Sequence, residues 1–599
     1  MNAGPPTIQF QQAIALHRQG MLAEAEQQYR EVLKVQPGHF DALHLCGLVT
    51  LQTGRPAQAE ALIAAALRVR PHNAEALANL GSALTVQSRH EEALQAYEQA
   101  LRANPAFAGA LRNQGVILQL LGRHEEAAEC FGRLVEMAPN ADFGLGSLFQ
   151  ARRYGCDWRD FEVLASSISK LVEAGRRADQ PFSFLSIDDS IARQRQSAVQ
   201  YANYLNPGSP APLWRGERYA HDRIRVAYVS ADFRGHIVAY LMAAIYQRHD
   251  SRRFETMGVS LGAADQSLIA LEARRALDQF HDVSTLDDDA AAMRLRELEV
   301  DIAVDLTGFT QGCRPGLFAR RPAPVQVSLL GFPATMGVPY MDYLFADTFV
   351  VPESLRPCYP EQIVYLPDSF QANDERRPLL AAAPTPSRAE AGLPEDSLVL
   401  CCFNNSYKLN PAVFTRWTRI LQAVPGSILW LLAERPAVQQ RLCEEAANRG
   451  IDTRRLAFAK RIPYPEHLAR LGLADLFLDT LPFNAGATVG DALWAGVPVL
   501  TCAGEAFSAR MGGSLLRAVG LPDLITDDPE EYERRAIELA RDPSRLAHYK
   551  QTLLGGRKSS PLFDSARYCR HLEAAYVQMW ERVQRGEAPE GFSVSARGP

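Results

Sequence analysis

The feature that most constrains the fold is a repeat of 34 residues that fills the first quarter of the chain. Small residues and prolines recur at this step in several registers that stay in phase. The registers are Ala25, Ala59, Ala93 and Ala127; Pro37, Pro71, Pro105 and Pro139; Gly47, Gly81 and Gly115; and Gly20, Gly54 and Gly122. Such regularity excludes chance and predicts a stack of equal units that bury a continuous core between neighbours.

Each unit has the pattern of two antiparallel helices of the tetratricopeptide type, whose period is 34 residues. The repeated alanine lets the two helices approach, and the proline ends the second helix. A bulky residue four positions after the alanine would fill the space between units, at Tyr29, Ile63, Tyr97 and Phe131. We expect residues 6–160 to form this array, with four repeats and a partial fifth.

Two asparagines occupy the same position of successive repeats. Asn79 and Asn113 are 34 residues apart, so both would lie on the inner surface of the groove that such an array forms. Amide side chains there would hold the backbone of an extended peptide. The alternative is that both are solvated polar residues on a helix. The array itself predicts a protein or peptide partner.

Composition narrows the class of protein. A chain of 599 residues with a net charge of −6 favours several globular domains, and it gives no reason to expect nucleic acid or a membrane as partner. The ten cysteines show neither a metal-ligand spacing nor a disulfide framework. No signal peptide or membrane-spanning run is recognised. We therefore expect a cytoplasmic protein.

The remaining sequence predicts a helical joint over 161–218, two α/β lobes over 219–385 and 386–586, and a disordered tail over 587–599. Buried strands alternate with helix-compatible stretches, which favours parallel sheets covered on both faces and a ligand site in the cleft between them. Strands are predicted at 223–230, 254–260, 300–306, 325–330, 343–351 and 363–366, and then at 398–403, 428–432, 456–459, 475–478 and 497–500.

The stretch 475–498 has the order strand, loop and helix that suits a nucleotide phosphate. Thr488 is placed to cap the helix, with Asp491 three residues later as in a capping box. Unpaired N–H groups and the helix dipole at Gly486 and Ala487 would then favour an anion such as a diphosphate. The alternative is that Thr488 and Asp491 only cap a helix.

Three more loops at predicted strand ends carry polar residues. His236 opens a helix after the first strand of the first lobe, where an imidazole can accept a proton near neutral pH, although a structural histidine is the alternative. Lys408 precedes a helix N-terminus, an unfavourable place for a cation unless an anion bridges them. Tyr464 and His467 could hold a nucleobase. Gly331 belongs to a further Gly/Pro loop with a weaker signal.

No metal ion is required by this pattern. Asp287, Asp288 and Asp289 offer an Asp-x-Asp sequence, but they precede an alanine-rich helical run and are expected to cap it. Lys408 and two helix N-termini would then carry the charge of a departing diphosphate.

The order of these motifs resembles that of a bacterial protein O-linked N-acetylglucosamine transferase of the SPINDLY-like type. The resemblance covers nearly the whole chain. It follows the tetratricopeptide repeats, Ser230 to His236, Arg321 to Thr335, Phe403 to Lys408 and Asp491 to Pro498. It implies a GT-B fold, UDP-GlcNAc as donor, no cofactor, and inverting transfer of the sugar to Ser or Thr of a protein held near the repeat groove.

The resemblance also implies roles for single residues. His236 would be the base or would position the sugar, and Lys408 would bind the diphosphate with Asn405 and Tyr407. Uracil and ribose contacts would come from Ile462, His467, Arg470 and Asp491, and a phosphate contact from Thr488. Further contacts with the nucleotide sugar are expected at Tyr464, Gly486, Ala487 and Gly331.

The chain departs from the family at several of these positions. Asn405 stands where a glutamine is expected, Tyr464 where animal enzymes have a lysine, and Ala487 where a first threonine would precede Thr488. A protein O-fucosyltransferase that uses GDP-fucose, or an adaptor with a degenerate transferase half, therefore remains an alternative.

Overall fold

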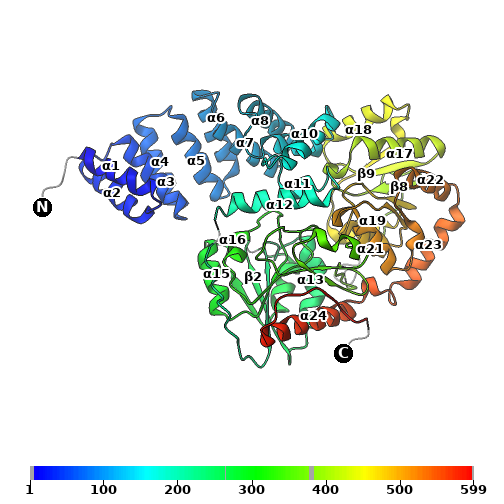
Figure 1. The fold of residues 1–599 in the computed structure, drawn as a ribbon. Helices are drawn as coiled ribbons and strands as arrows, with labels where there is room; N and C mark the ends of the chain where they lie inside the picture. The colour runs from blue at the N-terminus through cyan, green and yellow to red at the C-terminus, as the bar shows by residue number, and fades with distance from the viewer. Residues whose placement is uncertain (1–5, 209, 264, 377–383, 597–599) are drawn as a thin grey trace. The chain divides into compact units, whose positions relative to one another are not determined.

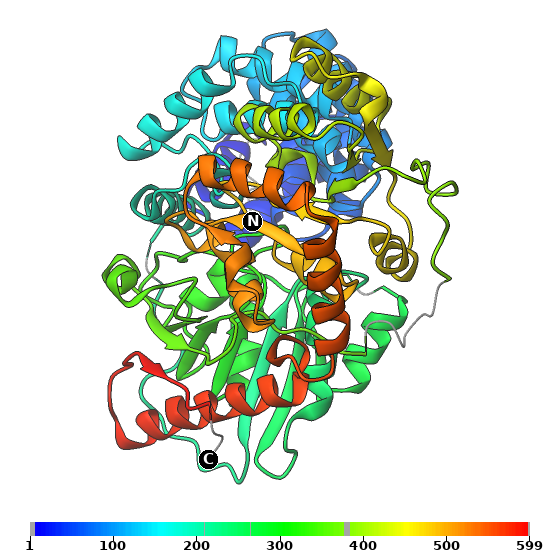
Figure 2. The same ribbon diagram turned by 90° about the vertical axis from the view of Figure 1, so that its right-hand side faces the viewer.

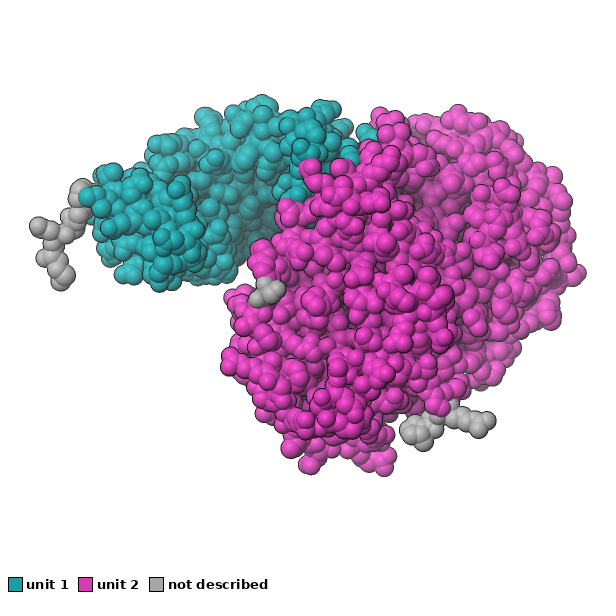
Figure 3. All heavy atoms as spheres, viewed as in Figure 1, with its two compact units in different colours: residues 1–152 teal, residues 153–599 magenta. Residues whose placement is uncertain are grey.

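The computed structural model describes residues 6–208, 210–263, 265–376 and 384–596 (Figures 1 and 2). The chain forms two compact units, residues 1–152 and 153–599 (Figure 3). The boundary lies eight residues before the predicted end of the repeat array at 160. The predicted boundary is wrong because the residues after Arg152 pack with the second unit.

The first unit is built from helix pairs, as the 34-residue period predicts. Its helices are α1 Pro6–Arg18, α2 Leu22–Val35, α3 Phe40–Gln52, α4 Pro56–Val69, α5 Ala74–Val86, α6 His90–Ala103, α7 Ala108–Leu120 and α8 His124–Met137, and it includes most of α9 Gly144–Tyr154. The four repeated alanines are all fully buried.

The close approach of paired helices depends on a glycine facing a bulky side chain. A Cβ added to Gly81 of α5 would lie 2.7 Å from the ring of Tyr97 on α6. Gly47 meets Ile63 and Gly115 meets Phe131 in the same way. The bulky residue of each repeat therefore fits over the glycine of its own unit, which is why both keep the same period.

The joint between the repeats and the lobes is helical, as predicted. It contains α10 Phe161–Glu173, α11 Pro181–Phe184 and α12 Ile191–Leu205. The segment just before it packs on the second lobe: the carbonyl of Tyr154 accepts hydrogen bonds from Ser406 and Arg435, and Trp158 lies against Phe414. These contacts explain why this segment belongs to the second unit.

The first lobe is an eight-stranded parallel sheet in the order β14-β7-β6-β5-β4-β1-β2-β3. Its strands are β1 Ile224–Ser230, β2 Phe254–Ser260, β3 Gln279–Asp282, β4 Ile302–Asp305, β5 Val325–Ser328, β6 Tyr343–Ala346, β7 Gln362–Tyr365 and β14 Phe592–Ser593. Helices α13 Ile237–Arg248, α14 Leu268–Arg275, α15 Asp288–Glu297 and α16 Pro315–Ala319 connect them.

The second lobe is a six-stranded parallel sheet in the order β10-β9-β8-β11-β12-β13. Its strands are β8 Val399–Cys402, β9 Ile428–Leu432, β10 Leu456–Ala459, β11 Leu476–Leu478, β12 Val499–Cys502 and β13 Ile525–Thr526. Its helices include α17 Pro411–Ala423, α18 Pro436–Asn448, α19 Tyr464–Leu471, α20 Ala487–Trp494, α21 Met511–Ala518, α22 Pro529–Ala540 and α23 Pro543–Gly556.

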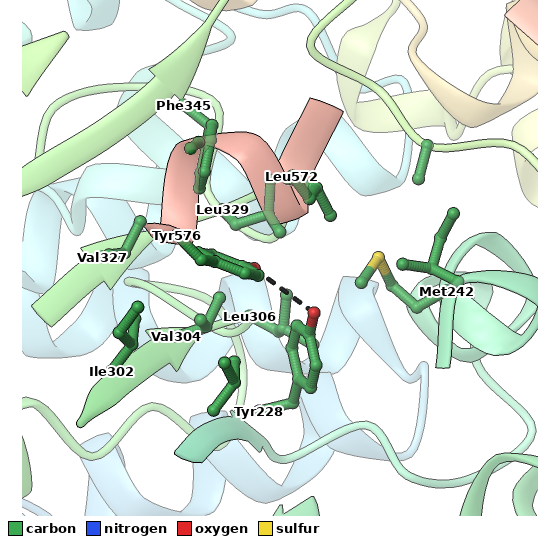
Figure 4. Close-up of a cluster of buried hydrophobic side chains, with 14 of the residues drawn as sticks. Tyr228, Met242, Ile302, Val304, Leu306, Val327, Leu329, Phe345, Leu572 and Tyr576 are labelled. Atoms are coloured by element: carbon green, nitrogen blue, oxygen red, sulfur yellow. Dashed lines mark hydrogen bonds between the residues drawn. The ribbon is translucent and has the colours of Figure 1, made fainter. Parts of the chain in front are cut away.

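The C-terminal part of the chain returns to the first lobe, which corrects two predicted boundaries. Helix α24 (Ser565–Arg585) buries Tyr568, Leu572 and Tyr576 in the core of the first sheet (Figures 1, 2 and 4). The Tyr576 hydroxyl lies 3.3 Å from that of Tyr228 on β1. The apolar face of α24 thus covers the first sheet, although its sequence position follows the second.

The expected disordered tail is ordered as far as Ala596. Residues Phe592 and Ser593 form β14, which pairs with β7 and extends the first sheet by one strand. The backbone N–H of Gly591 also donates to Gln362. The prediction of disorder is therefore wrong for residues 587–596, and residues 597–599 lie outside the described residues.

Among the described residues, no helix combines the length and the apolar character needed to cross a membrane.

Candidate functional site

The ammonium group of Lys408 reaches the loop that leads into α20. Lys408 lies in a single 3-10 turn after β8, and its Nζ donates a hydrogen bond of 2.7 Å to the carbonyl of Asn484. The ring centre of Phe483 lies 3.5 Å from the same nitrogen. Because β8 and β11 are neighbours in the sheet, the loops that follow them meet at one edge. The lysine and the loop before the helix are thus brought together, as predicted.

Asp479 fixes this loop from below. The buried carboxylate accepts hydrogen bonds from the N–H groups of Thr480 and Ala485 and from the hydroxyl of Thr501. Burial raises the pKa of Asp479 to about 6, against the lowering effect of these donors and of Lys408. Burial also lowers the pKa of Lys408 to about 8, although the negative charge of Asp479 opposes the shift. The site therefore holds a desolvated cation.

The start of α20 differs from the prediction by two residues. Gly486 occupies the N-cap position, Ala487 is the first helical residue, and no side chain caps the helix. Thr488 therefore lies within the first turn, and the capping box with Asp491 does not form. A Cβ on Gly486 would come 2.9 Å from Oε1 of Gln371, which explains the absence of a side chain there. Backbone N–H groups are left to face the loop.

Asp491 is buried and accepts a hydrogen bond of 2.7 Å from the hydroxyl of Tyr464, the first residue of α19. The Tyr464 ring also lies against Tyr240 of α13, with 4.5 Å between the ring centres. Because α13 belongs to the first lobe, this contact crosses the cleft. It places the beginning of α13, where His236 lies, opposite the beginning of α19.

His467 and Arg470 form one group on α19. Nη2 of Arg470 lies 3.1 Å from Nδ1 of His467, and both side chains contact the Phe403 ring. Burial, followed by the charges of Arg470 and Arg461, lowers the pKa of His467 to about 4. The imidazole is therefore neutral at pH 7 and can exchange hydrogen bonds with a base edge.

Asn405 and Tyr407 stand on the Lys408 turn but in different surroundings. The amide oxygen of Asn405 accepts a hydrogen bond from Arg461. Tyr407 is buried, with its ring 5.0 Å from that of Tyr154 and near those of Phe182 and Phe483. Tyr407 thus anchors the turn by aromatic packing.

His236 caps α13, as its predicted place at a helix start requires. Its Nδ1 lies 3.4 Å from the N–H of Val238 and 3.3 Å from Oδ2 of Asp232. Burial lowers the pKa of His236, while the charge of Asp232 opposes the shift. A neutral imidazole with its proton on Nδ1, donated to Asp232, would leave Nε2 able to accept a proton.

Two other predicted positions lie at the edges of the lobes. Gly331 follows β5, where a Cβ would collide with the backbone carbonyl of Leu306, so only glycine fits. Ile462 is 36% exposed in the loop between β10 and α19. Neither position shows a further contact that assigns it a role.

In the repeat unit, both predicted asparagines contact the preceding repeat. Nδ2 of Asn79 lies 2.8 Å from Nε2 of His44, and Nδ2 of Asn113 donates to Ser82 over 3.4 Å. Both amides are half-buried. They are not freely solvated, and a bound peptide would have to compete with these contacts or add to them.

The acidic run at 287–289 caps a helix, as expected. Asp287 accepts from the N–H of Ala290 at the start of α15, while Asp288 and Asp289 pair with arginines. Among the described residues, one group has a geometry that could hold a metal ion, made of His249, Cys569 and Glu573. Its members already bond to one another within the first lobe core.

Several residues of the site escaped the sequence reasoning. Asp479, Phe483 and Asn484 surround Lys408, and Gln371 of the segment between the lobes faces Gly486. A buried polar pair, Gln371 and Asn373, in an otherwise irregular segment is the signal that could have indicated them. Their positions depend on tertiary contacts that local patterns do not encode.

Comparison with known proteins finds the description "Glycosyl transferase family 41" on residues 212–382 and 380–572, and tetratricopeptide repeats on 47–106 and 86–142. A probable UDP-N-acetylglucosamine–peptide N-acetylglucosaminyltransferase SEC of Arabidopsis thaliana is 37% identical over 376 residues, which are 62% of this chain and 38% of the relative. A SPINDLY protein of Petunia hybrida, named as probably having the same activity, is 30% identical over 68% of this chain and 46% of its own length.

Among solved structures, a mutant O-GlcNAc transferase of Thermobaculum terrenum is similar, with a TM-score of 0.64 and 28% identity. The similarity covers 91% of this chain and 98% of that one. The chain spans less than half the length of the curated relatives that it matches.

Proposed function

Because the chain belongs to glycosyltransferase family 41, we propose that it is an inverting, metal-independent enzyme that moves N-acetylglucosamine from UDP-GlcNAc to Ser or Thr hydroxyls of proteins. The observation that carries the proposal is the convergence of the Lys408 ammonium with the loop that opens α20. A buried cation beside a helix N-terminus is a strong site for a diphosphate.

The reaction needs this site because the bond between the anomeric carbon and the diphosphate breaks, and the electrons leave with UDP. The Lys408 ammonium and the N–H groups at Ala487 and Thr488 would stabilise the negative charge that develops there. Tyr464, His467, Arg470 and Asp491 would hold the nucleoside.

The acceptor hydroxyl would attack the anomeric carbon from the face opposite the leaving diphosphate, so the configuration inverts. His236 lies near the beginning of α13, which meets α19 across the cleft through Tyr240 and Tyr464. Nε2 of a neutral His236 would take the proton of the hydroxyl as the new bond forms. Asp232 would hold the tautomer that this step requires.

The acceptor would be a protein segment guided by the repeats. Asn79 and Asn113 lie one repeat apart on corresponding helices, which suits regular contacts with an extended backbone. A cytoplasmic location and the absence of a metal requirement are part of the same proposal and rest on the sequence.

The experiment is transfer of labelled sugar from UDP-GlcNAc to proteins of a lysate from the source organism, with the full chain and with Lys408→Ala, in the presence of EDTA. We expect label on Ser or Thr for the wild type and a large loss for the variant. Labelled GDP-fucose in parallel separates the donors: transfer of fucose alone would overturn the donor assignment. Absence of transfer from either donor would favour an adaptor.

A further inference from the structure

Three neighbouring strands of the second sheet end in loops whose polar side chains meet. In the sheet order β10-β9-β8, each strand is followed within three residues by Arg461, Glu434 and Asn405, respectively. Arg461 Nη2 donates to the Asn405 amide oxygen, and Arg461 Nε lies 3.3 Å from Oε2 of Glu434. The backbone N–H of Arg461 donates to the same carboxylate over 2.8 Å. Carboxyl ends of parallel strands are where such folds bind ligands.

Asn405 links this arginine to the lysine of the site. The carbonyl of Asn405 accepts a hydrogen bond of 3.0 Å from the N–H of Lys408, which closes the turn that holds the lysine. The guanidinium of Arg461 therefore touches the residue that opens this turn. Its charge acts on the pKa of His467 on one side and on that of Tyr407 on the other. Arg461 thus lies between the nucleoside and diphosphate ends of the proposed donor site.

We propose that Arg461 is a second cation of the donor site and that its guanidinium binds an oxygen of the nucleotide diphosphate. The inference rests on the proposed function. A diphosphate carries more negative charge than Lys408 alone neutralises, and Gly486 and Ala487 contribute no polar side chain. An arginine forms charge-assisted hydrogen bonds with phosphate in a fixed fork.

The geometry suits this role because Arg461 is both oriented and accessible. Its side chain is 60% exposed, while Asn405 and Glu434 hold it through Nη2 and Nε. A guanidinium has five N–H donors, so it can keep both contacts and still donate to a phosphate. The alternative is a surface ion pair with Glu434, which would have little effect on any ligand.

The test is calorimetric titration of the full chain with UDP and with uridine, for the wild type and for Arg461→Met. Loss of a charge-assisted hydrogen bond should weaken UDP binding by about tenfold or more. Uridine lacks the phosphates, so its affinity should not change. Arg461→Lys should retain part of the UDP affinity because it keeps the charge without the fork.

Arg454→Met is the matched control. Arg454 precedes the other end of β10, is 88% exposed and pairs with Asp452, so its removal should leave both affinities unchanged. Melting temperatures of all variants report folding.

Unchanged UDP affinity in Arg461→Met would overturn the inference while leaving the proposed function intact. Equal weakening of UDP and uridine would also overturn it, because the arginine would then act on the loop and not on the phosphates. A wild type that binds no UDP would overturn the proposed function and the inference with it.

Discussion

The hydroxyl of Tyr464 donates a hydrogen bond to Oδ1 of Asp491, with 2.7 Å between the two oxygens. Asp491 is 4% exposed, and the Tyr464 ring also contacts Tyr240 of the first lobe. The pair therefore ties the start of α19 to α20 at the point where the two lobes meet. Tyr464 does there by hydrogen bonding and ring contact what a lysine at this position could not do.

Tyr464→Phe should destabilise the chain by about 1 kcal/mol, because a buried carboxylate loses a donor while the ring contact with Tyr240 is kept. Urea unfolding measures the change. Tyr340→Phe is the matched control: within the described part of the chain the buried Tyr340 hydroxyl has no hydrogen-bond partner, so this variant should not lose stability. Equal unfolding free energies for wild type and Tyr464→Phe would show that the hydroxyl contributes nothing.

UDP affinity should depend on pH through Lys408. Burial lowers its pKa to about 8, so the ammonium is charged below that pH and loses its proton as the pH rises through it. UDP binds the charged form. Its affinity should therefore be constant near pH 7 and fall by about tenfold by pH 9, a range in which the terminal phosphate is already ionised.

The control for this titration is Lys408→Met, whose UDP affinity should be weak and independent of pH over the same range. Uridine measured in parallel reports any titration of the base. If wild type and variant showed the same pH profile, the lysine would not be the group that binds the phosphates.

Asp232→Asn should lower turnover by about tenfold or more without changing the UDP affinity, because the amide no longer holds the proton on Nδ1 of His236. Steady-state kinetics and UDP titration measure the two quantities. Arg234→Gln removes the other side-chain partner of Asp232 and should leave turnover unchanged. A loss of UDP affinity in Asp232→Asn would assign the carboxylate to binding.

Gly81→Ala should destabilise the repeat unit by about 1–3 kcal/mol, because the new methyl group would overlap the buried Tyr97 ring. Gly132→Ala, in the interior of α8, meets no atom within 4 Å and should stabilise its helix by up to about 1 kcal/mol. Thermal unfolding of both variants checks the difference. The same response at both positions would contradict the packing of glycine against tyrosine.

Local periodicity predicted most of the fold. The repeat helices and strands such as Phe254–Ser260 and Ile428–Leu432 were predicted within a few residues, because each element carries its own pattern of apolar residues. The placement of α24 was not, since its apolar face would suit either sheet. The two-residue strand β14 is too short to leave a pattern.

The candidate site was predicted in part for a similar reason. Lys408 and the start of α20 meet because their loops follow neighbouring strands, which the order of elements implies. The cap at Gly486 was missed because Thr488 fits the sequence rule for a cap, whereas the close approach of Gln371 decides the position. Arg461 was missed because its contact with Asn405 joins residues 56 positions apart.

The measurement that tests the central claim most directly is an experimental structure of the chain with UDP bound. We predict the diphosphate within hydrogen-bonding distance of Lys408 Nζ and of the N–H groups that open α20. A diphosphate bound elsewhere, or a Lys408 that keeps only its bond to Asn484 while UDP occupies another pocket, would contradict the account.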